Sequence, residues 1–305
     1  MTSTALTVVI NAAGGAASAD AAVEQTVRDQ FEAVGIAADF RTGDADTIRA
    51  ACKEAKAGAA KAVVVGGGDG SISLAASELC GSDTALGILP LGTLNHFARD
   101  LAVGTTVEEA VGTIAAGHSR RVDLAELNGR TFINNSAIGL YPLMVFDREA
   151  QQKRLGRSKR LAMIVASLHT LARFDHQRLT LTVDGRRRQV DTPLLFVGNN
   201  DYLLELPRAG QRDRLDDGKL CVLVMRSKSR RAFAAATLRA LLGRTRPDDM
   251  VRLDEVEELI VESRRSRLRV ALDGEVEHLP PPLTYRIRRA ALTVLAPPPA
   301  DQPRQ

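Results

Sequence analysis

Tryptophan is absent from the sequence, and aromatic residues make up only 4% of its 305 positions. Because surfaces that bind single-stranded nucleic acid rely on aromatic rings for base stacking, we expect no nucleic acid partner. The three cysteines, Cys52, Cys80 and Cys221, are far apart and form no CxxC pair. Their spacing argues against a disulfide framework or a structural zinc site, and it fits a reducing cytoplasm.

Long apolar runs are also missing. No stretch approaches the roughly 20 apolar residues that a membrane-spanning helix needs. The N-terminal residues have no basic region of the kind that begins a signal peptide, and they predict a first strand instead. A formal net charge of +4 permits an anionic partner without identifying one.

Short apolar runs alternate with helical patterns through the first 120 residues. The expected strands are Ala5–Ile10, Lys61–Val65 and Leu86–Leu91. The expected helices are Ala19–Val34, Ile48–Ala57, Ser71–Leu79, Thr93–Leu101 and Val107–Ala116. Thr105 and Glu108 resemble a capping box before the last of these. Such alternation predicts a mostly parallel, doubly wound α/β sheet.

The pattern changes to mainly antiparallel β-structure after about residue 120. Asn128-Gly129 and Asp184-Gly185 each follow an apolar run and are typical of tight hairpin turns. Further strands are expected at Leu194–Val197, Leu220–Met225, Leu259–Glu262 and Leu268–Leu272, and helices at Lys159–Phe174 and Arg231–Leu242. We therefore expect an α/β domain over residues 1–120, a β-rich sandwich-like domain over 121–295 and a disordered tail over 296–305.

A glycine-rich turn follows the buried strand in VVVGGGDGSIS, at Val63–Ser73. Glycines at the start of a helix let backbone N–H groups converge on a phosphate, and Asp69 among them could hold a magnesium ion bridging the phosphates. The alternative is a flexible turn with Asp69 as a helix cap. The segment matches neither a Walker A loop nor GxGxxG.

A second strand, glycine turn and helix occur in GILPLGTLNHFARD, at Gly87–Asp100. Two such turns at the carboxyl ends of neighbouring strands face the same crevice of a doubly wound sheet. Thr93 would offer it a hydroxyl and Asn95 an amide. The alternative is a capping threonine and a turn asparagine.

Two acidic turns in the second half are further candidates. Glu275 follows Asp273-Gly274 at the end of an expected strand, where a carboxylate could act as the general base of phosphoryl transfer to an alcohol. The alternative is a solvated hairpin glutamate. Asp216 and Asp217 precede Gly218, and here the alternative is an acidic turn without a metal.

Four motifs occur in a family-like order: GGDGS at Gly67–Ser71, PLGTLNHFAR at Pro90–Arg99, LDDGKL at Leu215–Leu220 and LDGE at Leu272–Glu275. Together they resemble the diacylglycerol kinase catalytic domain family, in particular its bacterial soluble lipid kinases, over about residues 5–295. GGDGS alone is shared with NAD kinases and phosphofructokinase-like folds. The resemblance implies an NAD-kinase/phosphofructokinase-like first domain and an ATP- and magnesium-dependent lipid kinase.

The resemblance also implies site residues. The nucleotide would be bound by Asn11, Gly14, Gly15, Thr42, Gly67, Gly68, Asp69, Gly70, Ser71, Ile72, Ser73, Thr93 and Asn95. Glu275 matches the family's proton acceptor, and Asp69 would serve catalysis near the magnesium. A structural magnesium would bind the Asp217 carboxylate and the backbone carbonyls of Arg214 and Lys219.

Some positions depart from the family pattern. Ala12 replaces a proline in the first loop, Ser71 replaces a threonine, and His96 stands where an aspartate is usual. His96 and the loosely matching first loop leave open a non-catalytic nucleotide- or lipid-binding protein. A second alternative is an NAD-kinase-like phosphotransferase, although no second NAD-kinase-like motif follows the GGDGS turn.

The expected partner is a lipid at a membrane surface, reached by a cytoplasmic protein that associates peripherally, and a homodimer is an open alternative. Basic runs at Gln151–Arg160, Arg186–Arg188 and Arg264–Arg269 are either solvated faces or sites of attraction to an anionic bilayer.

Overall fold

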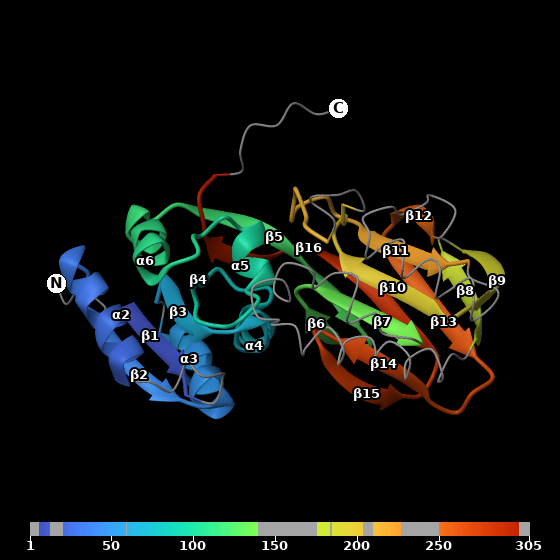
Figure 1. The fold of residues 1–305 in the computed structure, drawn as a ribbon, viewed down its shortest axis with the longest axis horizontal. Helices are drawn as coiled ribbons and strands as arrows, with labels where there is room; N and C mark the ends of the chain where they lie inside the picture. Colours follow the sequence, from blue (N-terminus) through green and yellow to red (C-terminus); the bar gives the residue numbers. More distant parts are fainter. Residues whose placement is uncertain are drawn as a thin grey trace, which may run out of the picture.

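The computed structural model describes residues 6–12, 21–58, 60–139, 176–183, 185–203, 210–226 and 250–298. These residues form an N-terminal α/β part and a C-terminal β-sandwich-like part that lie side by side along the longest axis (Figure 1). The expected fold class is therefore confirmed. The helices expected at Lys159–Phe174 and Arg231–Leu242, and the tail beyond 298, lie outside the described residues.

Four parallel strands form the centre of the α/β part. They are β1 (Leu6–Asn11), β2 (Ala38–Gly43), β3 (Ala62–Gly67) and β4 (Ala85–Pro90), in the spatial order β2-β1-β3-β4. The inner strands β3 and β4 are almost entirely buried, as is usual for parallel strands covered on both faces.

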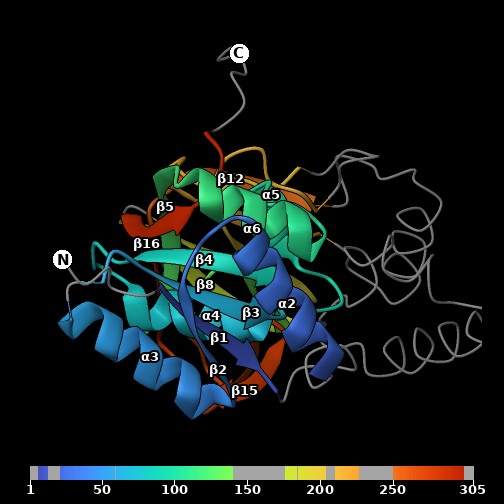
Figure 2. The same ribbon diagram turned by 90° about the vertical axis from the view of Figure 1, so that its left-hand side faces the viewer.

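Helices cover both faces of this parallel sheet. They are α2 (Ala21–Ala33), α3 (Ala45–Ala57), α4 (Asp69–Leu79), α5 (His96–Asp100) and α6 (Val107–Ala116). Helices α3 and α4 pack into one hydrophobic cluster, and α2 and α6 pack into another on the opposite face (Figure 2). The buried Phe31 of α2 anchors the second cluster by an edge-to-face contact with Phe40.

The sandwich-like part packs two sheets around one core. One sheet has the order β12-β11-β10-β7-β14-β15. Its strands are β7 (Asn135–Gly139), β10 (Leu194–Asn199), β11 (Leu220–Met225), β12 (Met250–Val256), β14 (Leu268–Leu272) and β15 (Glu275–Leu279). The facing strands are β5 (Ser119–Leu127), β6 (Arg130–Phe132), β8 (Gln177–Val183), β9 (Arg186–Thr192), β13 (Glu258–Ser263) and β16 (Leu283–Leu295).

Strand β16 connects the two parts. It pairs with β13 through Leu283–Arg286 and then continues beside β5 until Val294 pairs in parallel with Leu86 of β4. The parallel sheet and one sandwich sheet are consequently a single ten-stranded sheet. The domain boundary expected near residue 120 falls within strand β5, which belongs to the shared sheet. The division into domains at that residue stays a prediction.

Several expected elements differ from those observed. Helix α4 begins at Asp69, two residues early, whereas α5 begins only at His96 because Asn95 has a left-handed φ of 49°. The capping box is formed by Thr106 and Glu109, not by Thr105 and Glu108. The hairpin at Asn128-Gly129 is confirmed by the β5–β6 pairing.

None of the helices in the described ranges is long and apolar enough to cross a membrane.

Candidate active site

The two glycine turns predicted to face one crevice are in direct contact. A Cβ atom added to Gly92 would lie 2.4 Å from the Cα of Gly68, and one added to Gly67 would lie 2.5 Å from the Ser71 Oγ. Only glycine allows so close an approach of two backbones. The turn after β3 and the turn after β4 therefore form one surface, with α4 starting from it.

Asn11 and Ser71 join the end of β1 to this surface. The Asn11 Nδ2 donates a hydrogen bond of 2.6 Å to the Ser71 Oγ, while Ser71 and Ile72 are buried in the first turns of α4. The structure thus brings Asn11 beside the predicted phosphate turn. Gly14 and Gly15 lie outside the described residues.

Asp69 lies in the first turn of α4 rather than within a flexible turn. Its Oδ2 accepts from the backbone N–H of His96, and its Oδ1 accepts from that of Phe97, both at 3.2 Å. The Asn134 Nδ2 donates to the same Oδ1 at 3.4 Å. In this structure the carboxylate therefore caps α5, and a magnesium ion would have to share it with these donors.

Asn95 shapes the second turn instead of offering its amide to a ligand. Its Oδ1 accepts from the Gly92 N–H, and its Nδ2 donates to the carbonyls of Pro90 and Gly92, all at 3.0 Å. The structure thus favours the turn-asparagine alternative for Asn95. Thr93 is exposed on the same turn.

Thr42 lies near the end of β2, opposite Ile10 of β1. Its Oγ1 donates a hydrogen bond of 2.6 Å to the Glu24 carboxylate on α2. The hydrogen bonds from Thr42 and Arg28 lower the pKa of Glu24. Thr42 is exposed and one residue position along the sheet from Asn11, so the structure places it at the rim of the same surface.

Glu275 begins β15, directly after the turn Asp273-Gly274, whose φ angles are 45° and 93°. The Glu275 side chain is exposed. Asp273 itself is extensively bonded: it accepts from the backbone N–H groups of Ile133, Asn134 and Asn135 at 2.9–3.1 Å, and from the Ser73 Oγ at 2.6 Å. Desolvation raises the pKa of Asp273, against the effect of these bonds.

The Ser73–Asp273 bond brings the LDGE turn to helix α4, which starts at the glycine turn. Two motifs separated by 200 residues in sequence thus share one hydrogen bond. Sequence reasoning singled out Glu275 but gave Asp273 no role beyond its turn. The sequence signal that could have indicated a role for Asp273 is its place inside the LDGE motif.

The loop predicted to bind a structural magnesium precedes β11. The Arg214 Nε lies 2.9 Å from an Asp216 oxygen and 3.3 Å from the Asp217 Oδ1. Burial raises the pKa of Asp217. The buried Asp123 holds this loop by accepting from the Gly218 N–H at 2.7 Å.

The donor set of this loop fits a hard cation in part. Asp217 supplies a half-buried carboxylate oxygen, which suits magnesium. The described ranges contain no group of three or more histidine, cysteine and acidic side chains arranged to hold a metal. Backbone carbonyls would therefore have to complete the coordination, and the Arg214 guanidinium would have to leave Asp217. The Lys219 side chain is engaged elsewhere, 3.0 Å from Glu255.

Sequence reasoning missed a buried polar cluster behind Asp69. Arg212, whose side chain has no exposed surface, forms an ion pair of 2.7 Å with Asp100. It also donates to the Asn134 Oδ1 at 2.8 Å. No local pattern marks Arg212, because its side-chain partners Asp100 and Asn134 lie 112 and 78 residues away.

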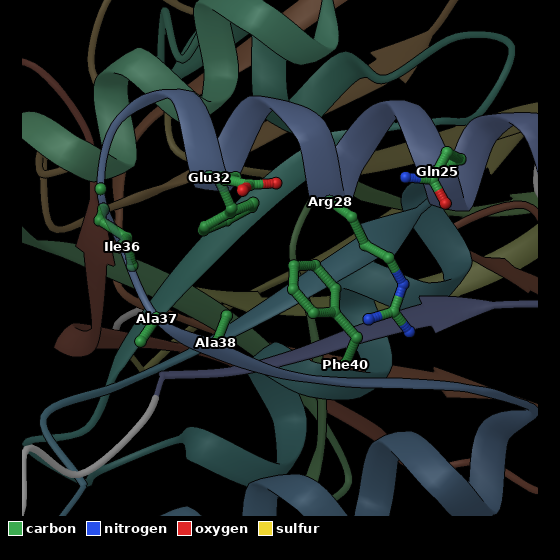
Figure 3. A pocket seen from close by; sticks show the side chains of 9 residues that line it. Gln25, Arg28, Glu32, Ile36, Ala37, Ala38 and Phe40 are labelled. Atoms are coloured by element: carbon green, nitrogen blue, oxygen red, sulfur yellow. The ribbon is translucent and has the colours of Figure 1, made fainter.

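A surface pocket lies away from these residues, between α2 and the beginning of β2 (Figure 3). The Arg28 Cζ lies 4.4 Å from the centroid of the Phe40 ring, and both side chains line the pocket. None of the residues predicted for the nucleotide lines this pocket. It is therefore not part of the candidate active site.

Glycine turns at the carboxyl ends of a parallel sheet, joined to a β-sandwich, form the architecture that the resemblance to the diacylglycerol kinase family implies. Comparison with known protein families assigns the two parts of the chain to domains of this architecture. Residues 5–127 match the diacylglycerol kinase catalytic domain, and residues 145–296 match the YegS C-terminal NAD kinase beta sandwich-like domain. The chain thus carries a diacylglycerol kinase catalytic domain followed by a YegS C-terminal domain.

Curated relatives include proteins named diacylglycerol kinase from Staphylococcus carnosus and Staphylococcus aureus. The chain is 26% identical to the first over 165 residues, which are 53% of each chain. It is 25% identical to the second over 165 residues, or 53% of this chain and 52% of the relative. The chain spans about half the length of the curated relatives it matches.

Solved structures share the fold. A diacylglycerol kinase from Bacillus anthracis str. Sterne superposes with a TM-score of 0.68 at 20% identity, covering 96% of this chain and 97% of that one. A second chain from that organism gives a TM-score of 0.73 at 22% identity, covering 96% and 98%. The likeness extends over both the α/β and the sandwich-like parts.

Proposed function

We propose that the protein is a lipid kinase that transfers the γ-phosphoryl group of ATP to a hydroxyl of diacylglycerol or a related lipid. The observation that carries the proposal is the Ser73–Asp273 hydrogen bond, which joins the glycine-turn helix to the turn that bears Glu275. This contact between the helix of the glycine turn and the turn before Glu275 supports a phosphate-binding surface and a base that come from different halves of the chain. The α/β part, about residues 1–120, would bind the nucleotide, and residues 121–295 would bind the acceptor.

In the proposed reaction, the backbone N–H groups at Gly67–Ser71 bind the phosphates at the start of α4. Asn11, Thr42 and Thr93 close the same surface. Glu275 accepts the proton of the lipid hydroxyl, whose oxygen forms a bond to the γ-phosphorus. The bond between that phosphorus and the β–γ bridging oxygen breaks, and ADP leaves.

Magnesium bound with ATP would neutralise charge on the phosphates, with Asp69 as the nearest carboxylate of the turn. The protein's own contribution is to orient that carboxylate, through its bonds to His96, Phe97 and Asn134. The loop around Asp217 would hold a second magnesium with a structural role.

The acceptor places the reaction at a membrane. Because a diacyl lipid does not leave a bilayer readily, the protein would associate peripherally with the surface. The basic cluster Lys153, Arg154, Arg157, Lys159 and Arg160, which lies outside the described residues, would supply attraction to anionic lipid.

The test is an incubation of the protein with radiolabelled ATP, magnesium and a mixed lipid extract, followed by identification of any labelled lipid. A parallel incubation offers NAD as the acceptor. Label in a diacylglycerol-like lipid supports the proposal, and label in NAD favours an NAD-kinase-like phosphotransferase. Nucleotide binding by calorimetry without transfer to any acceptor would instead indicate a non-catalytic binding protein.

A further inference from the structure

The guanidinium of Arg212 is buried at the junction of the α/β and sandwich-like parts. Its Nη1 donates to the Ile133 carbonyl at 2.7 Å and to the Asn199 carbonyl at 3.1 Å. Its Cζ atom lies 5.8 Å from the centroid of the Phe97 ring and 5.2 Å from that of the Tyr202 ring. Arg212 thus contacts α5, the β6–β7 connection and the residues after β10.

The charge of Arg212 is compensated inside the protein. Its Nε donates to the Asp100 Oδ2 at 2.7 Å, and only 7% of the Asp100 side chain is exposed. Burial alone would lower the pKa of Arg212, but the nearby Tyr202 and Asp100 outweigh it and raise that pKa. A buried ion pair contributes little net stability compared with apolar residues of the same volume. Its presence here calls for an explanation other than stability.

The hydrogen bonds around Arg212 close a ring that includes Asp69. Arg212 donates to the Asn134 Oδ1, and the Asn134 Nδ2 donates to Asp69. Asp69 accepts from the N–H groups that begin α5. Asp100, at the end of α5, accepts from Arg212 and so closes the ring. Every member of the ring is fixed by its two neighbours.

The ring depends on the shape of the arginine side chain. A guanidinium presents its donors in a rigid planar fork, whereas a lysine ammonium is a compact point charge on a flexible stem. Lysine would keep the charge opposite Asp100 but could not direct separate donors to Asp100, Asn134 and two carbonyl oxygens.

We propose that Arg212 is a positioning residue for the Asp69 carboxylate and the first turn of α5. Through Asn134 and Asp100 it sets how Asp69 faces the phosphate surface. The consequence for nucleotide binding rests on the proposed function. The orientation of Asp69 itself does not, and the two can be measured separately.

Hydrogen exchange measures the orientation in the nucleotide-free protein. The first N–H groups of a helix have no partner within the helix, so those of His96 and Phe97 are protected by Asp69. The variants are Arg212→Lys, Arg212→Met and Asp100→Asn. We expect exchange of these two amides, resolved by NMR, to become at least about tenfold faster in each.

Thr192→Val is the matched control. Thr192 is buried, and its Oγ1 shares one proton between the Leu194 and Met225 carbonyl oxygens and accepts from the Leu194 N–H. These groups lie at the other end of β10, so the change removes buried hydrogen bonds without touching the ring. The exchange rates of the Arg212 and Asp100 variants are compared with those of Thr192→Val after each rate is corrected for the measured free energy of unfolding of that variant. Wild-type exchange at His96 and Phe97 in folded Arg212→Lys would overturn the proposal. If Arg212→Met does not fold, Arg212→Lys and Asp100→Asn decide the question.

Calorimetry with Mg·ATP then measures the consequence. Loss of such a supporting contact weakens metal binding by roughly 10- to 100-fold, and we expect a Kd increase in that range for the three variants but not for Thr192→Val. Faster exchange with unchanged Kd would overturn the link to the nucleotide. A wild-type protein that binds no Mg·ATP would contradict the proposed function, and the exchange rates would still test the role of Arg212.

Discussion

The Ser73 hydroxyl and the Asp273 carboxylate are joined by a hydrogen bond of 2.6 Å, although 200 residues separate them in the chain. Asp273 also accepts three backbone N–H groups from residues 133–135. One side chain therefore fixes α4, the β6–β7 connection and the turn before Glu275 relative to one another.

Asp273→Asn should destabilise the protein. The amide would turn an NH₂ group toward N–H donors, and an unsatisfied buried polar group costs about 1–3 kcal/mol. Ser73→Ala should cost less, since only one neutral donor is lost. Urea denaturation measures both. Asp254→Asn, at an exposed position of β12, is the control, and equal unfolding midpoints for the Asp254 and Asp273 variants would contradict this account.

Glu275→Gln should abolish most turnover while retaining nucleotide binding. It keeps the shape of the side chain and removes the base, whose contribution is typically about 10²–10⁴-fold. Calorimetry with Mg·ATP and an assay of labelled lipid separate the two effects.

The control for this prediction is Glu277→Gln, two residues along the same strand, where the carboxylate pairs with Arg130. Turnover at the wild-type rate in Glu275→Gln, or an equal loss in both variants, would show that Glu275 is not the base.

The local features of the fold could be predicted from the sequence. The glycine turns after β3 and β4 and the hairpin at Asn128-Gly129 depend on residues that are neighbours in the chain. Strands β11 and β14 were predicted with the observed bounds because each is a short apolar run. Polar edge strands were not predicted: β2 and β15 contain no fully buried residue, so their sequences carry no run of apolar core residues.

The polar contacts of the site could be predicted only in part. The order of the motifs predicted Asp69, Asn11 and Glu275 as site residues. It did not predict the donors that orient Asp69, which are His96, Phe97 and Asn134. The expectation that Asn95 would offer its amide to a ligand did not allow for its left-handed backbone, which directs that amide into its own turn. Such contacts depend on tertiary packing and leave no local pattern.

Asp217→Ala should remove the stabilisation that magnesium gives to the protein. Burial raises the pKa of Asp217 because a charged carboxylate loses hydration there. A bound cation would offset the free-energy cost of keeping this carboxylate charged. Thermal unfolding with and without magnesium measures the effect, since a ligand of the folded state raises Tm. Asp216→Ala is the control because Asp216 is exposed and pairs with Arg214. A magnesium-dependent shift of equal size in wild type and Asp217→Ala would rule out this site.

Asp123 should make stability depend on pH. Burial raises the pKa of Asp123 in the folded state, so the folded protein binds this proton more tightly than the unfolded chain does. Its contribution is full below the unfolded pKa and is lost as the pH rises through the folded pKa.

Asp123→Asn removes this titration. The stability of wild type relative to Asp123→Asn should therefore increase as the pH is lowered through the raised pKa of Asp123 toward the ordinary aspartate value of about 3.9, measured by urea denaturation at each pH. Asn also leaves the Gly218 or Ala290 N–H without an acceptor, which lowers stability at every pH. A stability difference that is constant with pH would show that the pKa of Asp123 is not raised.

Association with anionic membranes should depend on the cluster Lys153, Arg154, Arg157, Lys159 and Arg160. Each basic residue near an anionic surface contributes roughly 1 kcal/mol, and the attraction falls off within a Debye length. A variant with all five changed to glutamine should therefore lose most binding to vesicles that contain anionic lipid, and wild-type binding should weaken at high salt. Vesicle sedimentation measures both. A variant with Arg186, Arg187 and Arg188 changed to glutamine tests separately whether the exposed basic run of β9 contributes to this attraction. Salt-insensitive binding of the wild type, or wild-type binding by the five-site variant, would exclude this cluster from membrane association.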